Sequence, residues 1–193
     1  MVLTFAGLWG VPFLVTHYGL TPISAAVLCS AMMITWAIGS IGFSAASDRI
    51  SRRNPLYLGG LVISLLLWAA LIYVPQWPNA VLCVLLGAIG FFSGCFIISF
   101  AFAKESGPAR FAGTVSGISN MGVIQGPMTI QPLVGIILDR HWQGAPIDGK
   151  RVFDFASYQQ SFSLILLWGV VALGLLLMTK ETNCRQNDGR LMK

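Results

Sequence analysis

The stretch SDRISRRNP, residues 47–55, lies between two long apolar segments and holds the densest charge in the sequence. Its charged residues are Asp48, Arg49, Arg52 and Arg53. Across all 193 residues only 10% are charged and 55% are hydrophobic, and the mean hydropathy is +0.75. A soluble domain carries about 25% charged residues, so this chain has too little polar surface to face water. The composition predicts an integral membrane protein whose main solvent is a lipid bilayer.

Apolar runs recur between polar breaks along the chain, and each run predicts a membrane-crossing helix. A helix needs about 20 apolar residues to cross the hydrocarbon core. Prolines fall at or beside the breaks, where a helix stops or begins. We therefore predict an all-α fold, with a six-helix membrane domain over residues 1–178 and a cytoplasmic tail over residues 179–193. The predicted spans are residues 2–15, 23–47, 56–74, 80–103, 111–138 and 161–178.

Lysine and arginine are unevenly divided between alternate loops, and this division predicts the orientation. The larger set is Arg49, Arg52, Arg53, Lys104, Arg110, Lys180, Arg185, Arg190 and Lys193, and the smaller set is Arg140, Lys150 and Arg151. Basic loops stay on the cytoplasmic side of a membrane. The loop 47–55 and both termini are thus expected in the cytoplasm, in a plasma membrane of the bacterial inner-membrane type. The same rule explains the net charge of +5 better than nucleic-acid binding does.

Motifs for enzyme chemistry or metal binding are missing from the sequence. It contains no Ser-His-Asp arrangement, no HExxH and no phosphate-binding GxxxxGK[ST]. Its four cysteines lack CxxC spacing, which argues against a disulfide framework or a zinc site. We expect no enzymatic activity, no cofactor and no metal. His17 and His141 fall near the outer interface and are interpreted as solvated interface residues.

The run D-R-I-S-R-R, from Asp48 to Arg53, resembles the short cytoplasmic signature of the major facilitator superfamily. That signature reads roughly G-x-x-x-D-R-x-G-R-R and joins the second and third helices of each six-helix half. Here Ser44 and Ser51 stand in place of its two glycines. The run ARFAGTVSGISNMG, residues 109–122, is similar to the family's eleventh helix, and the tail KETNCR is similar to the end of such a transporter.

The resemblance implies the C-terminal six-helix half of a twelve-helix secondary transporter. Such a transporter moves a small-molecule solute by alternating access, with no covalent step, through a site at the midplane between its halves. The first span looks clipped, so a truncated or split product is expected, whose partner is an N-terminal six-helix half or a second copy. The resemblance also implies that Asp48 and the loop arginines form a latch against the other half. The alternative is a non-transporting membrane scaffold or remnant.

Uncharged polar residues are the candidates for solute contact, because no Asp, Glu, Lys or Arg lies deep inside any span. A carboxylate for proton symport would then belong to the other half. An amide in hydrocarbon needs either another helix or a wet cavity as its partner, and both readings stay open. The candidate solute-pathway residues are Trp9, Thr35, Trp36, Asn120 and Gln125.

Glycines at four-residue spacing predict where helices approach closely, because GxxxG pairs let two backbones come together. The predicted packing glycines are Gly90 and Gly94 in the fourth span and Gly113, Gly117, Gly122 and Gly126 in the fifth. Spans 56–74 and 161–178 are dominated by Leu, Ile and Val. Their composition favours a lipid-facing position.

Overall fold

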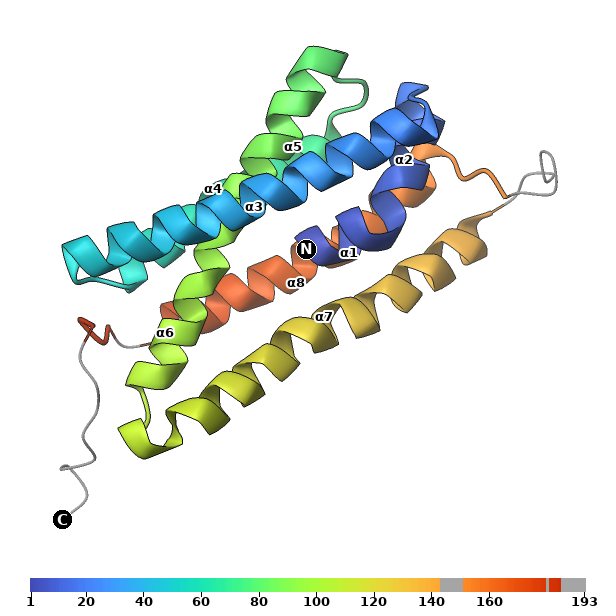
Figure 1. Ribbon diagram of the computed structural model, residues 1–193. Helices are drawn as coiled ribbons and strands as arrows, with labels where there is room; N and C mark the ends of the chain where they lie inside the picture. The colour runs from blue at the N-terminus through green and yellow to red at the C-terminus, as the bar shows by residue number, and fades with distance from the viewer. Residues whose placement is uncertain (143–150, 180, 185–193) are drawn as a thin grey trace.

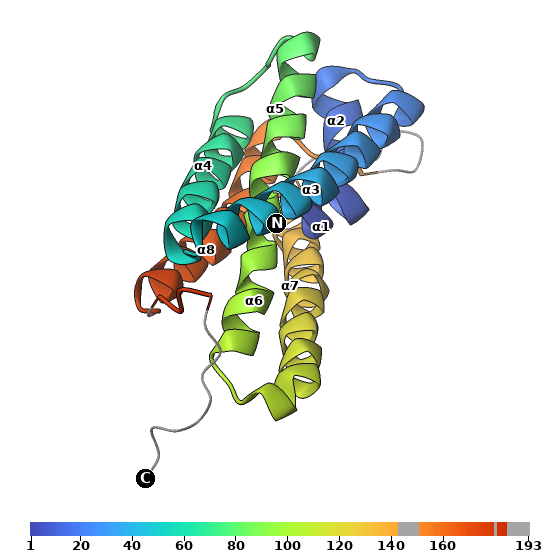
Figure 2. The same cartoon turned by 60° about the vertical axis from the view of Figure 1, so that its left-hand side comes forward.

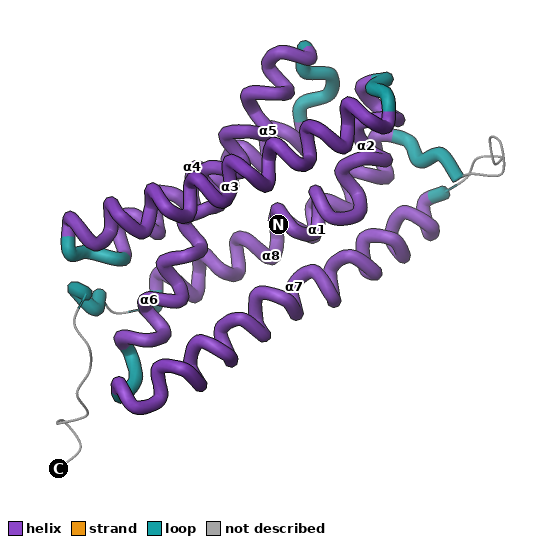
Figure 3. Tube along the Cα trace, viewed as in Figure 1, coloured by secondary structure: helices purple, strands orange, loops and turns teal. Residues whose placement is uncertain are grey.

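The computed structural model describes residues 1–142, 151–179 and 181–184, and all regular secondary structure in these ranges is helical. Figure 3 shows helices joined by short loops. The all-α prediction is therefore confirmed. The elements in chain order are α1 (Val2–Thr4), the π-helix η1 (Phe5–Trp9), α2 (Gly10–Tyr18), α3 (Pro22–Ile50), α4 (Asn54–Tyr73), α5 (Asn79–Ser93), the 3-10 turn η2 (Gly94–Phe96), α6 (Ile97–Glu105), the 3-10 turn η3 (Ala109–Phe111), α7 (Ala112–His141) and α8 (Phe155–Leu177).

These elements join into six apolar rods. Five of them are long and apolar enough to cross a membrane, and Val2–Tyr18 is a shorter apolar helix. The six-helix membrane fold expected from the sequence is thus confirmed. The largest boundary difference is at α8, which begins at Phe155 rather than at residue 161, because the Asp154 side chain accepts a hydrogen bond from the Ser157 backbone N–H at 3.2 Å. A polar cap of this kind starts a helix before the apolar run does.

Helices α3 and α5 pack at very short range because glycines occupy their contact. A Cβ added to Gly39 would lie 2.0 Å from the Phe91 carbonyl oxygen, and one added to Gly90 would lie 2.3 Å from the Met32 carbonyl oxygen. A Cβ on Gly94 would lie 2.4 Å from the Gly39 carbonyl carbon. The two backbones therefore meet without intervening side chains, as small residues allow in membrane helices.

Aromatic rings fill the centre of the bundle and join helices that are distant in sequence. The Phe5 ring lies edge-on to Phe13, Trp68 and Phe162, with ring centroids 5.4–5.9 Å apart. A second buried cluster lies nearer to the loop between α3 and α4, and it contains Tyr57, Leu61, Leu65, Cys95, Ile98, Phe102 and Leu176. The core thus ties η1, α4, α6 and α8 into one body.

Helices α3 and α7 run along the same side of the bundle, with α1 and α2 between them (Figures 1 and 2). Only 17% of the most apolar window of each of these two rods is buried, against 44% for α4 and 50% for the rod of α5 and α6. The lipid-facing position expected for span 56–74 is therefore wrong for one side of α4, where Leu61, Trp68 and Leu71 are fully buried. The open faces of the bundle belong instead to α3 and α7.

Candidate functional site

The loop between α3 and α4 reverses the chain within three residues. Helix α3 ends at Ser51, whose φ of 53° lies in the left-handed region, and the Ser51 N–H donates to the Asp48 carbonyl at 3.3 Å. Glycine adopts that conformation most easily. This is a physical reason for the glycine that the family signature carries at this position. The tight turn brings Asp48 and Arg53 together.

The Arg53 side chain points inward and is only 8% exposed. Its Nη1 donates to the Asp48 carboxylate at 2.7 Å and to the Ser47 hydroxyl at 3.0 Å. Its Nη2 and Nε donate to Glu105 Oε1 at 2.7 and 3.2 Å. Because Glu105 ends α6, this guanidinium holds the C-terminal ends of α3 and α6 and the start of α4 together.

The chain beyond α8 completes this arrangement. The Glu181 carboxylate accepts hydrogen bonds from the backbone N–H groups of Arg53 at 2.9 Å and Asn54 at 2.8 Å. The Thr182 hydroxyl donates to the second carboxylate oxygen of Glu105. Since Arg53 and Asn54 begin α4, Glu181 caps this helix from the far end of the sequence. We call Asp48, Arg53, Glu105, Glu181 and Thr182 the clasp.

Charges inside the clasp stabilise one another. Burial by itself works against a charged guanidinium, but hydrogen bonds to Glu105 and Asp48 outweigh it and raise the pKa of Arg53. Burial likewise works against a charged Glu181, but hydrogen bonds from backbone N–H groups outweigh it and lower the pKa of Glu181. The donors to Glu181 are Arg53, Asn54, Asn183 and Thr182.

Glu181 should make the stability of the chain depend on pH. Its pKa is depressed in the folded state, so its stabilisation is present above the unfolded value near 4.5 and is lost as the pH falls through the folded value. Glu181→Gln should therefore lower the thermal unfolding midpoint in detergent at pH 7, and the gap to wild type should close as the pH falls below 4.5. Tryptophan fluorescence measures the unfolding. Asp139→Asn, at the opposite end of the bundle, should keep the wild-type pH dependence, and a pH-independent gap would contradict the capping role.

Sequence reasoning found only part of the clasp. Asp48 and Arg53 come together, whereas Arg49 and Arg52 are exposed, and neither of their side chains takes part in a hydrogen bond or ion pair that the structure gives for the described residues. Glu105 and Glu181 were not singled out. They could have been found as acidic residues of the expected cytoplasmic loops, in a chain with only seven acidic residues.

Three of the five candidate pathway residues take part in helix packing. The Trp9 indole N–H donates to the Gln131 carbonyl at 3.1 Å, and the Gln131 amide donates back to the Leu3 carbonyl at 3.2 Å. The Thr35 hydroxyl donates to the Met32 carbonyl at 2.9 Å and lies against Gly90. Trp36 is half-buried and packs against the core. Their side chains hold α1, α3, α5 and α7 in place.

The other two candidates, Asn120 and Gln125, are exposed on α7, and neither amide has a hydrogen-bond partner among the described residues. A helix turns about 100° per residue, so a separation of five residues places them about 140° apart. Asn120 lies about 20° from the direction of Gln131, which contacts α1. Asn120 is therefore on the side of α7 that faces α1, and Gln125 is on the outer side.

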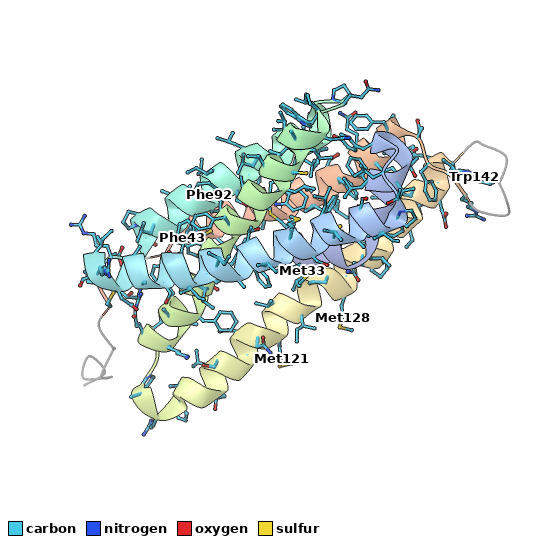
Figure 4. The ribbon with its side chains drawn as sticks, turned by 45° about the horizontal axis from the view of Figure 1, so that its top comes forward. Met33, Phe43, Phe92, Met121, Met128 and Trp142 are labelled. Carbon is cyan, nitrogen blue, oxygen red and sulfur yellow. The ribbon has the colours of Figure 1, made fainter. Side chains whose placement is uncertain are left out.

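Predicted packing glycines behave differently in the fourth and fifth spans. Gly90 and Gly94 lie against the backbone of α3, as described above. Around the four predicted packing glycines of α7, a Cβ would meet no atom of the described chain outside its own helix within 4 Å; these are Gly113, Gly117, Gly122 and Gly126. Within this chain, the GxxxG pairs of α7 therefore pack no neighbouring helix. Figure 4 shows Met121 and Met128 projecting from the same open helix, and their side chains are 70% and 72% exposed.

Comparison with known proteins bears on this arrangement as a whole. A family model described as Major Facilitator Superfamily matches residues 1–189. No curated protein and no solved structure matches the chain. The matched range includes the clasp, the close packing of α3 on α5, and the open helix α7.

Proposed function

Because the chain belongs to the Major Facilitator Superfamily and is a membrane transport protein, we propose that it supplies one wall of a solute pathway, in the manner of a C-terminal six-helix half. The pathway would open alternately to the two sides of the membrane, with no covalent step and no cofactor. A second six-helix unit would supply the opposite wall. Asn120 is the residue that carries this proposal.

The amide of Asn120 is exposed in the middle of a membrane-crossing helix. An amide facing hydrocarbon without a partner is costly, at up to several kcal/mol in the extreme case. Asn120 also lies on the side of α7 that faces α1, and α1 and α2 lie between α3 and α7 (Figure 1). A water-filled pathway along that side of α7 would satisfy the amide. The exposed amide therefore supports a solute pathway better than it supports a purely structural role.

In this proposal the clasp keeps the half rigid while the two halves move. It joins the cytoplasmic ends of α3, α4 and α6 and the tail through a nearly buried guanidinium. Asp48 is the clasp residue suited to contact the other half, because its side chain is 61% exposed. Arg53 is not suited to such a contact, because it is enclosed by its own half.

Water-accessible labelling tests the pathway without knowledge of the solute. In a variant whose native cysteines are replaced by alanine, Asn120→Cys should react with a membrane-impermeant maleimide when a second six-helix unit is present. Val84→Cys is the control, because Val84 is 71% exposed on α5 and should face lipid. Reaction from both sides of the membrane is the expected result. Failure of residue 120 to react from either side, with folded protein present, would overturn the pathway.

The control for a functional alanine scan also follows from the structure. Ser64 in span 56–74 looks neutral in the sequence, but its hydroxyl is fully buried and lies 2.8 Å from the Ser93 hydroxyl. Ser64→Ala would break a bond between α4 and α5. Val84→Ala is the better control when Asn120→Ala and Gln125→Ala are compared for solute uptake.

Orientation is a separate part of the proposal. We place both termini in the cytoplasm of a cell with a plasma membrane of the inner-membrane type, because the basic loops gather on that side. Reporter fusions after residue 193 and within residues 143–150 should give opposite compartment signals. Equal signals from the two fusions would contradict the six-span topology.

A non-transporting scaffold or remnant is the second candidate function. One observation favours this function. The bundle has one open side, and the described chain supplies no wall opposite to it. The labelling experiment separates the two candidates, because a scaffold gives residue 120 no reason to meet water from both sides of the membrane.

A further inference from the structure

The open side of the bundle carries two stripes of exposed side chains at seven-residue spacing. On α3 they are Val27, Ile34, Ile41 and Asp48, which we call the α3 stripe. From η3 into α7 they are Phe111, Ile118, Gln125 and Pro132, which we call the α7 stripe. Seven residues are nearly two turns of a helix, so each stripe drifts by only about 20° per step and stays on one face. Ile41 and Ile118 are 73% and 64% exposed.

Opposite charge lies at the same cytoplasmic end of both stripes. Asp48 ends the α3 stripe and is 61% exposed, with one carboxylate oxygen bonded to Arg53. The α7 stripe begins beside Arg110, which is exposed and forms no salt bridge in the described chain. Helix α7 also starts without a side-chain cap and without an acidic residue in its first turn. The positive N-terminal end of α7 and the guanidinium of Arg110 would therefore both attract a carboxylate.

We propose that this side of the bundle binds a second copy of the same chain, with the α3 stripe of each copy against the α7 stripe of the other. Helices α3 and α7 cross the membrane in opposite directions. In two copies of one orientation, their contact is thus antiparallel. Pairing Asp48 with Phe111 then sets Ile41 against Ile118 and Ile34 against Gln125, since both stripes advance about 10.5 Å per seven residues. The contact occurs twice about a two-fold axis, as in an isologous dimer.

Two further features of these helices suit this occupant. The two GxxxG pairs of α7, Gly113 with Gly117 and Gly122 with Gly126, meet no other helix of the described chain, although such pairs favour a close partner helix. Ser30 is exposed on α3 one turn from Ile34, without a hydrogen-bond partner in the described chain. In the proposed register it lies near Gln125 of the second copy, so the two unpartnered polar groups could bond across the contact. Arg49 is about 100° around α3 from Asp48 and is turned away from the stripe.

This inference rests on the proposed function, because both need a second six-helix unit against α3 and α7. It is tested by charge exchange on the full chain in lipid nanodiscs or liposomes, with association measured by energy transfer between labelled copies. Asp48→Arg and Arg110→Asp should each weaken association by roughly tenfold, since each change acts twice per dimer. The double variant D48R/R110D should restore it to within about threefold. Asp48→Arg also loses the bond to Arg53, so Arg110→Asp is the cleaner single change.

Cross-linking gives a readout that does not depend on the charges. With the native cysteines replaced by alanine, Ile41→Cys combined with Ile118→Cys should form a disulfide-linked species of twice the 20.8 kDa chain mass. The control pair, Val84→Cys with Leu167→Cys, is also exposed but lies on α5 and α8 and should cross-link no more than random collision gives. A monomeric chain at all protein-to-lipid ratios, or equal cross-linking in both pairs, overturns self-pairing. If residue 120 still labels beside an N-terminal half, the proposed function stands without it.

Discussion

Arg53→Ala should destabilise the chain by about 3 kcal/mol or more, because it removes the guanidinium that pairs with the nearly buried carboxylate of Glu105. The Arg53 side chain is 8% exposed and its partner Glu105 is 12% exposed. Without the guanidinium, Glu105 keeps its desolvation penalty and only the Thr182 hydroxyl bond. We expect a lower thermal unfolding midpoint in detergent and faster tryptic cleavage near the helix ends that the clasp joins.

Arg52→Ala is the matched control for this change. It removes the neighbouring arginine, which is exposed and outside the clasp, so its effect on the unfolding midpoint should be small. Arg53→Lys should lie between the two, because an ammonium cannot reach Asp48 and Glu105 with the same planar geometry. Equal losses from Arg52→Ala and Arg53→Ala would mean that the clasp is not a stabilising unit.

The second large effect is expected at the contact of α3 with α5. Gly39→Ala places a methyl group 2.0 Å from the Phe91 carbonyl oxygen and 2.8 Å from its carbonyl carbon. Both are backbone atoms inside a helix, so the methyl group can be accommodated only if the two helices separate. Overpacking commonly costs about 1–3 kcal/mol, and a clash with rigid backbone belongs at or above the upper end.

Gly117→Ala serves as the control because it makes the same chemical change on an open helix face. A Cβ at Gly117 meets nothing within 4 Å, and alanine favours a helix over glycine by up to about 1 kcal/mol. Gly39→Ala should therefore lower the unfolding midpoint in detergent while Gly117→Ala leaves it unchanged or raises it. A similar loss from both would show that the α3–α5 contact is looser than described.

Apolar runs were enough to predict the six-helix fold because a membrane leaves few other solutions. Run length gave the number of spans, and proline and cap residues fixed most of their ends. Composition did not reveal which of these spans are buried among other helices. Span 56–74 looks as apolar as a lipid-facing helix, yet Leu61, Trp68 and Leu71 of α4 are buried by neighbouring helices. Apolar side chains suit lipid and protein interior equally, so hydropathy cannot separate the two.

The clasp shows a similar limit. A signature of local sequence identified Asp48 and Arg53, which are five residues apart. Their partners Glu105 and Glu181 are brought to them only by helix packing. GxxxG spacing is equally local. It occurs in both α5 and α7, but only the pair in α5 has a helix of this chain to pack against. A short motif indicates what a helix can contact, and the fold decides whether the contact exists.

Glu181 accepts the backbone N–H of Asn54 across 127 positions of sequence, and this separation has a consequence for biosynthesis. A ribosome delivers α4 to the membrane long before it reaches residue 181. During that interval the start of α4 lacks its cap, and Arg53 can bind only Asp48 and, later, Glu105. Domains made during synthesis acquire their contacts in chain order. The helix ends that the clasp joins thus reach their final stability only after α8 has been inserted, so chains released before residue 181 would present an incomplete clasp to quality-control proteases.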